Sequence, residues 1–227
     1  MSLLPDKNLY VVTSALRPLT GTWSFSERFN QTIQTLKRIR EKDSNSIIIL
    51  SDASVNTVPE MEKQILCNLC DYYYDLSDNP DVKYLSSNRM QSPAETILLL
   101  ITLSIIKQQP FLSQCKRIFK ISARSVLNDE FDPEEHNIFG KYVFKKRIAT
   151  WMTPQQVNAS HLLITRMYSF CTSLLDDYIQ VLQNNLPLLN VVDFEHAHFV
   201  NIPKNRLVEF EKIHIWGWLS GGSIEQY

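Results

Sequence analysis

The stretch CKRIFKISARSVLNDEFD, residues 115–132, holds the features from which the rest of the fold can be inferred. It opens with a β-prone run over residues 117–121 that carries two isoleucines and a phenylalanine. At Ser122 its character changes, and polar and charged residues follow as far as Asp132. Open α/β sheets build ligand sites from polar groups at the C-terminal ends of buried strands. The stretch therefore predicts a central strand that ends at a binding site.

A strand–helix–strand unit opens the chain. Residues 8–13 (NLYVVT) are typical of a strand, and Ser24 with Glu27 forms the S-x-x-E capping box that starts a helix. Residues 46–50 (SIIIL) are apolar enough for a strand that is buried on both faces. Such a unit implies parallel pairing with a right-handed crossover. We therefore predict an α/β fold, with a Rossmann-like, mainly parallel central sheet flanked by helices in a single domain.

Further signals complete the expected elements. Ser92 begins the sequence S-P-A-E, a strong helix start, and the apolar residues after it predict a buried helix that runs to about Lys107. Residues 71–81, with three consecutive tyrosines, are expected to be irregular, and residues 82–85 to form a short edge strand. After Asp132 the pattern is less regular.

The composition excludes several classes of protein. A net charge of −1 leaves no basic excess to neutralise phosphates, which argues against a general nucleic-acid-binding protein. The N-terminus has no apolar segment typical of a signal peptide, and no apolar run is long enough to span a bilayer. Cys67 and Cys70 form a C-x-x-C within a helical pattern, with no second pair. We expect reduced thiols and a cytoplasmic protein.

The familiar nucleotide-binding motifs are absent from the sequence. It contains neither G-x-G-x-x-G nor G-x-x-x-x-G-K-[ST], and with five glycines it has little material for a glycine-rich phosphate loop. This argues against dehydrogenases, kinases and P-loop enzymes. Any diphosphate bound by this protein would need a metal ion or side-chain cations to neutralise its charge.

Both kinds of neutralising group occur in the opening stretch. Asp129, Glu130 and Asp132 offer the hard oxygen ligands that Mg²⁺ and Mn²⁺ prefer. Alternatively, Lys120 and Arg124 would hold phosphate oxygens directly, the arginine through its bidentate fork. The acidic residues also fit a solvated loop without any ligand.

Two other groups of polar residues are candidates for chemistry. Asp52 follows a buried strand, where it suits either a base N–H or ribose hydroxyl as partner, or the role of a turn aspartate. Glu195, His196 and His198 form the densest cluster of proton-transfer groups. Glu195 or His196 fits a general base that activates a sugar hydroxyl, and the pair equally fits packing at a strand end.

In this order of elements the chain resembles the GT-A-type nucleotide-sugar glycosyltransferases, of the small kind found in bacterial polysaccharide clusters and large DNA viruses. Residues 10–15 (YVVTSA) and 27–32 (ERFNQT) look like the first strand and helix of that family. Residues 47–52 (IIILSD) look like its second strand, whose aspartate contacts the nucleoside. Residues 119–129 (FKISARSVLND) resemble a pattern of related proteins and lie where a GT-A enzyme carries its metal-binding D-x-D.

The last of these pieces departs from the family's pattern. Alanine and serine replace a glycine and a tyrosine, and no D-x-D stands at the strand end. The resemblance therefore leaves two expectations for the cofactor. One is Mn²⁺ or Mg²⁺ bound by Asp129 or Asp132, and the other is a metal-independent enzyme with Lys120 and Arg124 in place of the cation.

The resemblance implies a glycosyltransferase that moves a sugar from a UDP- or GDP-linked donor to a glycan or other acceptor, in polysaccharide biosynthesis. Residues 8–132 would form the nucleotide-sugar-binding half, 133–219 the acceptor-side half and 220–227 a flexible tail. The nucleoside side would comprise Thr13, Ser14, Arg17, Asp52 and Ser54. The diphosphate and sugar would be surrounded by Asn88, Arg89, Lys120, Ser122 and Arg124. The catalytic residues on the acceptor side would be Glu195 and His196.

Two other functions compete with this one. A sugar-nucleotide nucleotidyltransferase shares the same sheet but needs a glycine-rich loop after the first strand, where this chain has only Gly21. A non-catalytic Rossmann-like interaction module needs no site at all. The enzyme hypothesis expects Arg124 and Asp52 to point into one open cleft. The interaction hypothesis expects the two residues to lie on opposite faces, or Arg124 to pair with a structural carboxylate.

Overall fold

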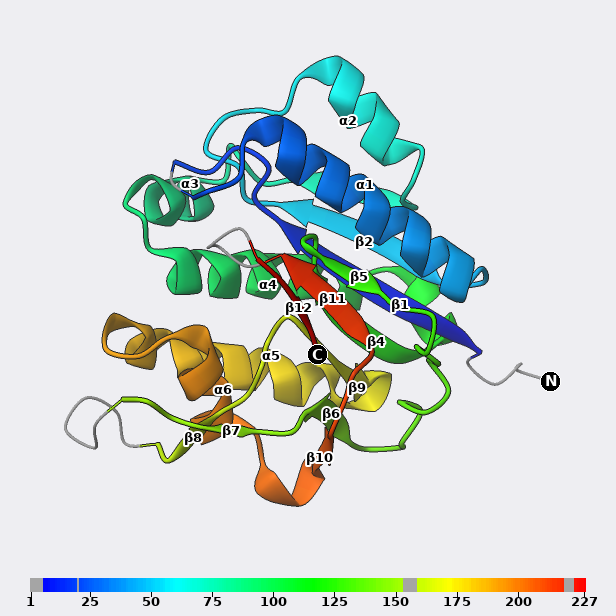
Figure 1. The fold of residues 1–227 in the computed structure, drawn as a ribbon, viewed down its shortest axis with the longest axis vertical. Helices are drawn as coiled ribbons and strands as arrows, with labels where there is room; N and C mark the ends of the chain where they lie inside the picture. Colours follow the sequence, from blue (N-terminus) through cyan, green and yellow to red (C-terminus); the bar gives the residue numbers. More distant parts are fainter. Residues whose placement is uncertain (1–5, 20, 153–158, 219–222) are drawn as a thin grey trace.

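The computed structural model describes residues 6–19, 21–152, 159–218 and 223–227. Its centre is a seven-stranded sheet with the strand order β10-β6-β9-β4-β1-β2-β3 (Figure 1). The strands of this sheet are β1 (Lys7–Ser14), β2 (Ile47–Asp52), β3 (Tyr72–Asp75), β4 (Cys115–Ser122), β6 (Tyr142–Lys145), β9 (Met167–Cys171) and β10 (Leu207–Phe210). A three-stranded sheet consists of β5 (Ser125–Leu127), β11 (Ile215–Trp218) and β12 (Ile224–Gln226). A two-stranded sheet consists of β7 (Ile148–Ala149) and β8 (His161–Leu162).

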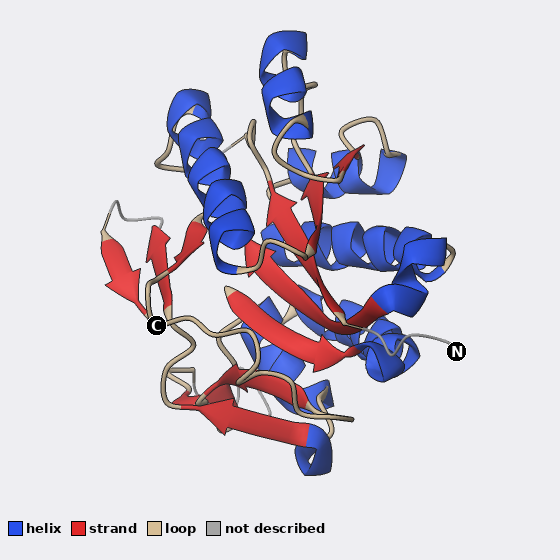
Figure 2. Ribbon diagram, turned by 90° about the vertical axis from the view of Figure 1, so that its right-hand side faces the viewer, coloured by secondary structure: helices blue, strands red, loops and turns tan. Residues whose placement is uncertain are grey.

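Helices cover both faces of the central sheet (Figure 2). The α-helices are α1 (Phe25–Lys42), α2 (Glu60–Cys67), α3 (Pro80–Ser87), α4 (Gln91–Lys107), α5 (Leu175–Asn185) and α6 (Phe194–Asn201). Short 3-10 helices are η1 (Pro110–Gln114), η2 (Thr172–Leu174), η3 (Leu186–Asn190) and η4 (Lys204–Arg206). The predicted capping box is present at α1, where Ser24 and Glu27 cap each other's backbone. None of the helices in the described residues is long and apolar enough to cross a membrane.

The alternation of side chains along β1 explains the two layers. Leu9 and Val11 lie in the core shared with α4 and α5, whereas Tyr10 and Val12 lie in the core shared with α1. Successive residues of a strand point to opposite faces, so a strand buried on both faces must be apolar throughout. All four of these side chains are 0% exposed. The apolar sequence of this strand therefore places it in the middle of the molecule.

The direction of the strands decides where a site can form. The strand β1 pairs in parallel with β2 and β4, and β2 pairs in parallel with β3. Only β9 runs antiparallel to its neighbours in this sheet, within the described residues. The C-terminal ends of β1, β2 and β4 consequently meet at one edge. The predicted α/β fold, with a mainly parallel sheet flanked by helices, is confirmed.

Two expectations for the segment after β2 were wrong. Residues 71–81 are not irregular throughout, because three tyrosines and Asp75 form the edge strand β3. Residues 82–85 belong to helix α3 rather than to an edge strand. Asn79 caps this helix by accepting hydrogen bonds from the backbone N–H groups of Asp81 and Val82. An asparagine before a proline is a helix start as well as a turn signal, and here the helix forms.

The prediction of a flexible C-terminal tail over residues 220–227 was also wrong in part. Residues 220–222 lie outside the described residues, but Ile224–Gln226 form β12, which pairs with β11. Tyr227 is only 6% exposed, and its ring lies beneath the charges of Lys145 and Arg166. Burial of this aromatic ring and the strand pairing together hold residues 224–227 in place.

Candidate functional site

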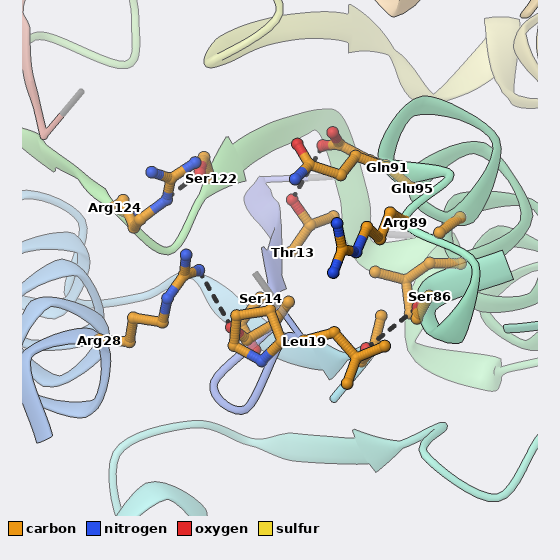
Figure 3. A pocket seen from close by; sticks show the side chains of 15 residues that line it. Thr13, Ser14, Leu19, Arg28, Ser86, Arg89, Gln91, Glu95, Ser122 and Arg124 are labelled. Carbon is orange, nitrogen blue, oxygen red and sulfur yellow. Dashed lines mark hydrogen bonds between the residues drawn. The ribbon is translucent and has the colours of Figure 1, made fainter. Parts of the chain in front are cut away.

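A pocket with a volume of about 170 Å³ opens at the C-terminal edge of the central sheet (Figure 3). The ends of β1, β2 and β4 form its floor, and α1, α3 and α4 supply its walls. Its lining consists of Thr13, Ser14, Ala15, Pro18, Leu19, Arg28, Ala53, Ser86, Arg89, Gln91, Ala94, Glu95, Leu98, Ser122 and Arg124. Five of the residues predicted from the sequence line it, namely Thr13, Ser14, Arg89, Ser122 and Arg124.

The carboxylate of Asp52 lies behind the pocket wall and is 0% exposed. It accepts hydrogen bonds from the Ser14 hydroxyl, from the Leu16 backbone N–H at 3.0 Å and from the Ser54 backbone N–H at 3.2 Å. Burial raises the pKa of this carboxyl, and the hydrogen bonds oppose the rise. Asp52 thus fixes the turn after β1 and holds Ser14 at the pocket. The enzyme hypothesis expected Asp52 to point into the cleft beside Arg124, and this expectation was wrong.

The guanidinium of Arg124 lies at the turn between β4 and β5 and lines the pocket. Within the part of the chain that the structure describes, its side chain forms no hydrogen bond or ion pair. Burial lowers the pKa of Arg124, and the charge of Arg166 lowers it further, against the opposing effect of Glu95. A desolvated cation without a partner is costly, so this position favours an anionic ligand.

A second guanidinium, that of Arg28 on α1, stands next to Arg124 on the same side of the pocket (Figure 3). It donates hydrogen bonds to the backbone oxygens of Trp23 at 3.2 Å and Ala15 at 3.1 Å. Burial and the charge of Arg124 lower its pKa to about 10. Gly21 lets the loop after β1 approach Arg28 closely, because a Cβ at this position would collide with the guanidinium. Its φ of 134° is also one that L side chains rarely adopt. The loop after β1 is therefore shaped around this cation.

The third guanidinium belongs to Arg89, between α3 and α4, on the opposite side of the β1 end (Figure 3). Its backbone has a φ of 61°, in the left-handed region that non-glycine residues rarely adopt. No side-chain hydrogen bond or ion pair holds Arg89 within the described ranges. The first turn of α4 lies beside it and lacks a side-chain cap. The positive end of the helix dipole adds to the positive charge here.

Lys120 does not reach the pocket, because its ammonium group is buried behind it. The side chain is 3% exposed, and its Nζ lies 2.6 Å from Glu95 Oε1 and 2.8 Å from the Thr165 carbonyl oxygen. Although burial opposes ionisation, the Lys120 charge lowers the pKa of Glu95. Glu95 also accepts a hydrogen bond from the Thr13 hydroxyl at 3.3 Å. Lys120 therefore holds an ionised carboxylate at the pocket.

The two predicted catalytic residues lie on α6, outside the pocket lining. The carboxylate of Glu195 accepts a hydrogen bond from the Thr165 hydroxyl at 2.8 Å, and burial raises its pKa. Since the carbonyl of Thr165 also binds Lys120, a polar chain links Glu195 to the pocket. His196 is 0% exposed, with Nδ1 2.5 Å from Asp193 and Nε2 2.6 Å from the Thr150 hydroxyl. Both residues lie in a helix rather than at a strand end.

The two predicted metal ligands lie away from the pocket. Asp129 is 93% exposed in its side chain, where it forms ion pairs with Arg38 and Lys42. Asp132 is exposed and accepts a hydrogen bond from the Glu134 backbone N–H at 2.9 Å. Among the described residues no three His, Cys, Asp or Glu side chains are grouped in a way that could hold a metal ion.

The remaining predicted binding residues support the pocket from behind or lie outside it. Ser54 is buried and accepts a hydrogen bond from the Arg17 backbone N–H at 2.9 Å, which ties the loop after β1 to the end of β2. The Arg17 side chain donates to the Thr57 carbonyl oxygen at 3.1 Å. Asn88 is exposed and donates to the Tyr84 carbonyl oxygen at the end of α3.

Four polar lining residues were not predicted from the sequence: Arg28, Ser86, Gln91 and Glu95. The sequence S-P-A-E gave Glu95 the role of a capping residue at the start of a helix. The helix α4 begins earlier, at Gln91, and the carboxylate of Glu95 pairs with Lys120 instead. Arg28 follows the capping box on a helix that starts next to the β1 loop. That position is a usable signal, because helices after a first strand begin near the ligand edge of an α/β sheet.

The GT-A fold of this chain is shared with glycosyltransferases of known structure. The first is core-mannan synthase A (CmsA/Ktr4) from Aspergillus fumigatus in a Mn/GDP form, with a TM-score of 0.52 and 10% identity over 90% of this chain and 73% of that one. The second is the mannosyltransferase Ktr4p from S. cerevisiae, with a TM-score of 0.54 and 9% identity over 91% and 69%. The third is the galactosyltransferase LgtC in complex with donor and acceptor sugar analogs, with a TM-score of 0.54 and 7% identity over 89% and 72%.

Sequence comparison adds nothing to this relationship. No protein-family model matches the sequence, and no curated protein is similar to it. The low identities establish the fold alone. The predicted GT-A architecture is thereby confirmed, and the activity has to be argued from the pocket.

Proposed function

We propose that the protein is a glycosyltransferase that transfers a sugar from a UDP- or GDP-linked donor to a glycan or other acceptor. The observation that carries the proposal is the pocket at the C-terminal edge of β1, β2 and β4, with guanidiniums from Arg28, Arg89 and Arg124 in its lining. Ligands of open α/β sheets bind outside the carboxyl ends of the strands. Three arginine side chains at that edge match the charge of a diphosphate.

The division of charge within the pocket assigns parts of the donor to parts of the site. The guanidiniums would hold the diphosphate, and the loop after β1, with Ser14, Ala15 and Pro18, would face the nucleoside. Among the described residues, Glu95 is the only carboxylate in the lining, and it would repel phosphate. Ionised by Lys120, it is suited to accept hydrogen bonds from sugar hydroxyls. The donor sugar would therefore lie toward α4.

The acceptor half is supported by the polar chain from Glu95 through Lys120 and Thr165 to Glu195. Glu195 and His196 would shape the acceptor side as positioning residues, because neither side chain lines the pocket. Structures with the same fold include one bound to GDP and one with donor and acceptor sugar analogs. These support a nucleotide-sugar donor and a sugar acceptor, and a role in polysaccharide biosynthesis fits such a pair.

Calorimetry with UDP, GDP, UDP-sugars and GDP-sugars tests this function directly. We expect one nucleotide to bind with a dissociation constant on the order of micromolar to millimolar, as substrates of enzymes commonly do. Glu95→Gln should weaken binding of the sugar nucleotide by about tenfold while leaving the free nucleoside diphosphate unaffected. Glu41→Gln, an exposed surface carboxylate, serves as the control. If no nucleotide or sugar nucleotide binds, the proposal is wrong.

A further inference from the structure

The residues after β4 do not fit the divalent cation that the GT-A fold implies. A neighbour with this fold was solved in a Mn/GDP form. At the corresponding strand end this chain has Ser122, Ala123 and Arg124, which offer one hydroxyl, one methyl and one cation. Mn²⁺ and Mg²⁺ are bound through carboxylate oxygens. The guanidinium would itself repel a metal ion at this position.

The described part of the chain offers no other carboxylates at the pocket to replace the missing ligands. Glu95 is the only acid that the described residues contribute to the lining, and the Lys120 ammonium already neutralises it at 2.6 Å. Asp129 is paired with Arg38 and Lys42 on the surface. Residues 1–5, 20, 153–158 and 219–222, which the structure does not describe, contain no Asp, Glu, His or Cys in the sequence. The chain therefore lacks the acidic pair that a cation would need at this edge of the sheet.

We propose that this protein binds the diphosphate of its donor without a divalent cation, through the guanidiniums of Arg28, Arg89 and Arg124. The inference rests on the proposed function. Arg28 and Arg124 stand on one side of the β1 end and Arg89 on the other, so that a diphosphate between them is contacted from both sides (Figure 3). Planar guanidiniums bind phosphate oxygens in a bidentate manner, which supplies both charge and orientation.

The charges around the pocket favour an anionic ligand. Arg124 and Arg89 have no hydrogen-bonding partner for their side chains among the residues that the structure describes. Burial lowers the pKa of Arg124, and the positive charge of Arg166 lowers it further. The left-handed backbone of Arg89 comes from the end of α3, where the Met90 N–H donates to the Leu85 carbonyl oxygen at 3.0 Å, and this turn places the Arg89 side chain in the pocket lining. The first turn of α4 beside it, without a side-chain cap, favours negative charge as well.

The first test compares nucleotide binding in EDTA with binding in Mn²⁺, by calorimetry with UDP and GDP. The inference expects equal dissociation constants in the two conditions, within about threefold, and a strong fall in affinity with added salt. Binding that appears only with Mn²⁺, or improves more than about tenfold with it, would overturn the inference and leave the proposed function intact. Absence of binding in both conditions would overturn the two proposals together.

The second test exchanges the charges at the strand end. Arg124→Ala should weaken binding by about ten- to a hundredfold in EDTA and in Mn²⁺ alike, since a charged hydrogen-bonding group is lost. Arg206→Ala, which removes an exposed arginine that pairs with Asp177, should leave the affinity unchanged. A normal melting temperature of each variant shows that it folds, and Arg124→Gln replaces the alanine variant if that one does not. Equal affinity of Arg124→Ala and the parent protein would contradict the inference.

A double variant gives the sharpest form of the test. Ser122→Asp combined with Arg124→Asp builds a D-x-D at the end of β4. We expect this variant to lose nucleotide binding in EDTA and to regain it, at least in part, when Mn²⁺ is added. If it still binds as the parent does in EDTA, then Arg124 does not hold the diphosphate and the inference is wrong.

Discussion

The strand β4 carries an arginine near its start and another just beyond its end, and the two have opposite environments. Arg117 is 1% exposed and donates to the Ser169 hydroxyl at 2.8 Å and to the carbonyl oxygens of Ile138 and Lys141 at 3.1 and 3.2 Å. Arg124 lines an open pocket and has no such partners among the described residues. A satisfied cation belongs to the structure, whereas an unsatisfied one in a hollow is available to a ligand.

The difference shows that residue type at a strand does not identify a site. Lys120 lies between the two arginines in the sequence. It resembles Arg117, since its ammonium group pairs with Glu95 and donates a hydrogen bond to a backbone carbonyl oxygen. The sequence offered Lys120 and Arg124 as equals for phosphate binding. The two differ in the folded protein because α4 brings Glu95 to Lys120, whereas Arg124 lines the pocket.

Removal of Arg117 should have the largest effect of the changes proposed here. Arg117→Met leaves the Ser169 hydroxyl and two carbonyl oxygens without their donor, in the interior of the protein. We expect a loss of about 3 kcal/mol in the free energy of unfolding, measured by urea denaturation. Arg124→Met should change the same quantity by less than about 1 kcal/mol, because no hydrogen bond is lost. Similar losses for both variants would erase the distinction between the two ends of β4.

Acid should weaken the Arg117 end through His136, whose Nδ1 lies 2.9 Å from the Ser169 hydroxyl. Burial lowers the pKa of His136 to about 3, against about 6.5 in an unfolded chain. The native state keeps the ring neutral, so its stabilising contribution is complete above pH 6.5 and is lost as the pH falls toward 3. At pH 5 the loss in the free energy of unfolding amounts to about 2 kcal/mol.

The measurement compares unfolding free energies at pH 7 and pH 5. His136→Phe should reduce the loss between these values by about 2 kcal/mol, because the phenyl ring does not titrate. Part of the loss should remain, since burial also lowers the pKa of His198, to about 4. An unchanged loss in the variant would show that His136 does not stay neutral in the native state.

A smaller effect than at the Arg117 end is expected at the pocket end, from Gly21→Ala. A methyl group at this position would meet the Arg28 guanidinium, and the φ of 134° strains any L side chain. We expect about 1 kcal/mol of destabilisation and a few-fold weaker nucleotide binding. Gly140→Ala is the matched control, because its φ is 65° and nothing lies within 4 Å of the added methyl. It should cost similar stability without affecting binding, and a loss of binding in both variants would contradict the role given to Gly21.

The central sheet was predictable because its strands carry long, unambiguous signals. Residues 8–13 and 46–50 are apolar on both faces, and the Ser24 capping box fixes the start of α1. The strand β3 was missed because its tyrosines lie between turn-forming residues, and α3 because Asn79 before a proline suits a turn as well as a helix. Short elements depend on tertiary contacts that local patterns do not contain.

The site was less predictable, since the partners of a long polar side chain come from elements that only the folded chain brings next to it. The sequence placed Arg124 and Ser14 at the edge of the sheet, because strand ends follow from strand positions. It did not show that Asp52 turns inward to bind Ser14 and two backbone N–H groups. Nor did it show that Glu95 leaves the helix end to meet Lys120. In both cases burial of the carboxylate decides its role.

The pairing of β5 with β11 has a consequence for local opening of the native protein. The turn that carries Arg124 is closed by the Trp218 backbone N–H, which donates to the Arg124 carbonyl oxygen at 3.0 Å, and by the register of Gly217 with Ser125. These contacts belong to a small three-stranded sheet, separate from the central sheet in which β1 lies between β2 and β4. A small sheet can open locally without unfolding the core. We expect the Trp218 amide to exchange its hydrogen faster than the amides of β1 in the native protein.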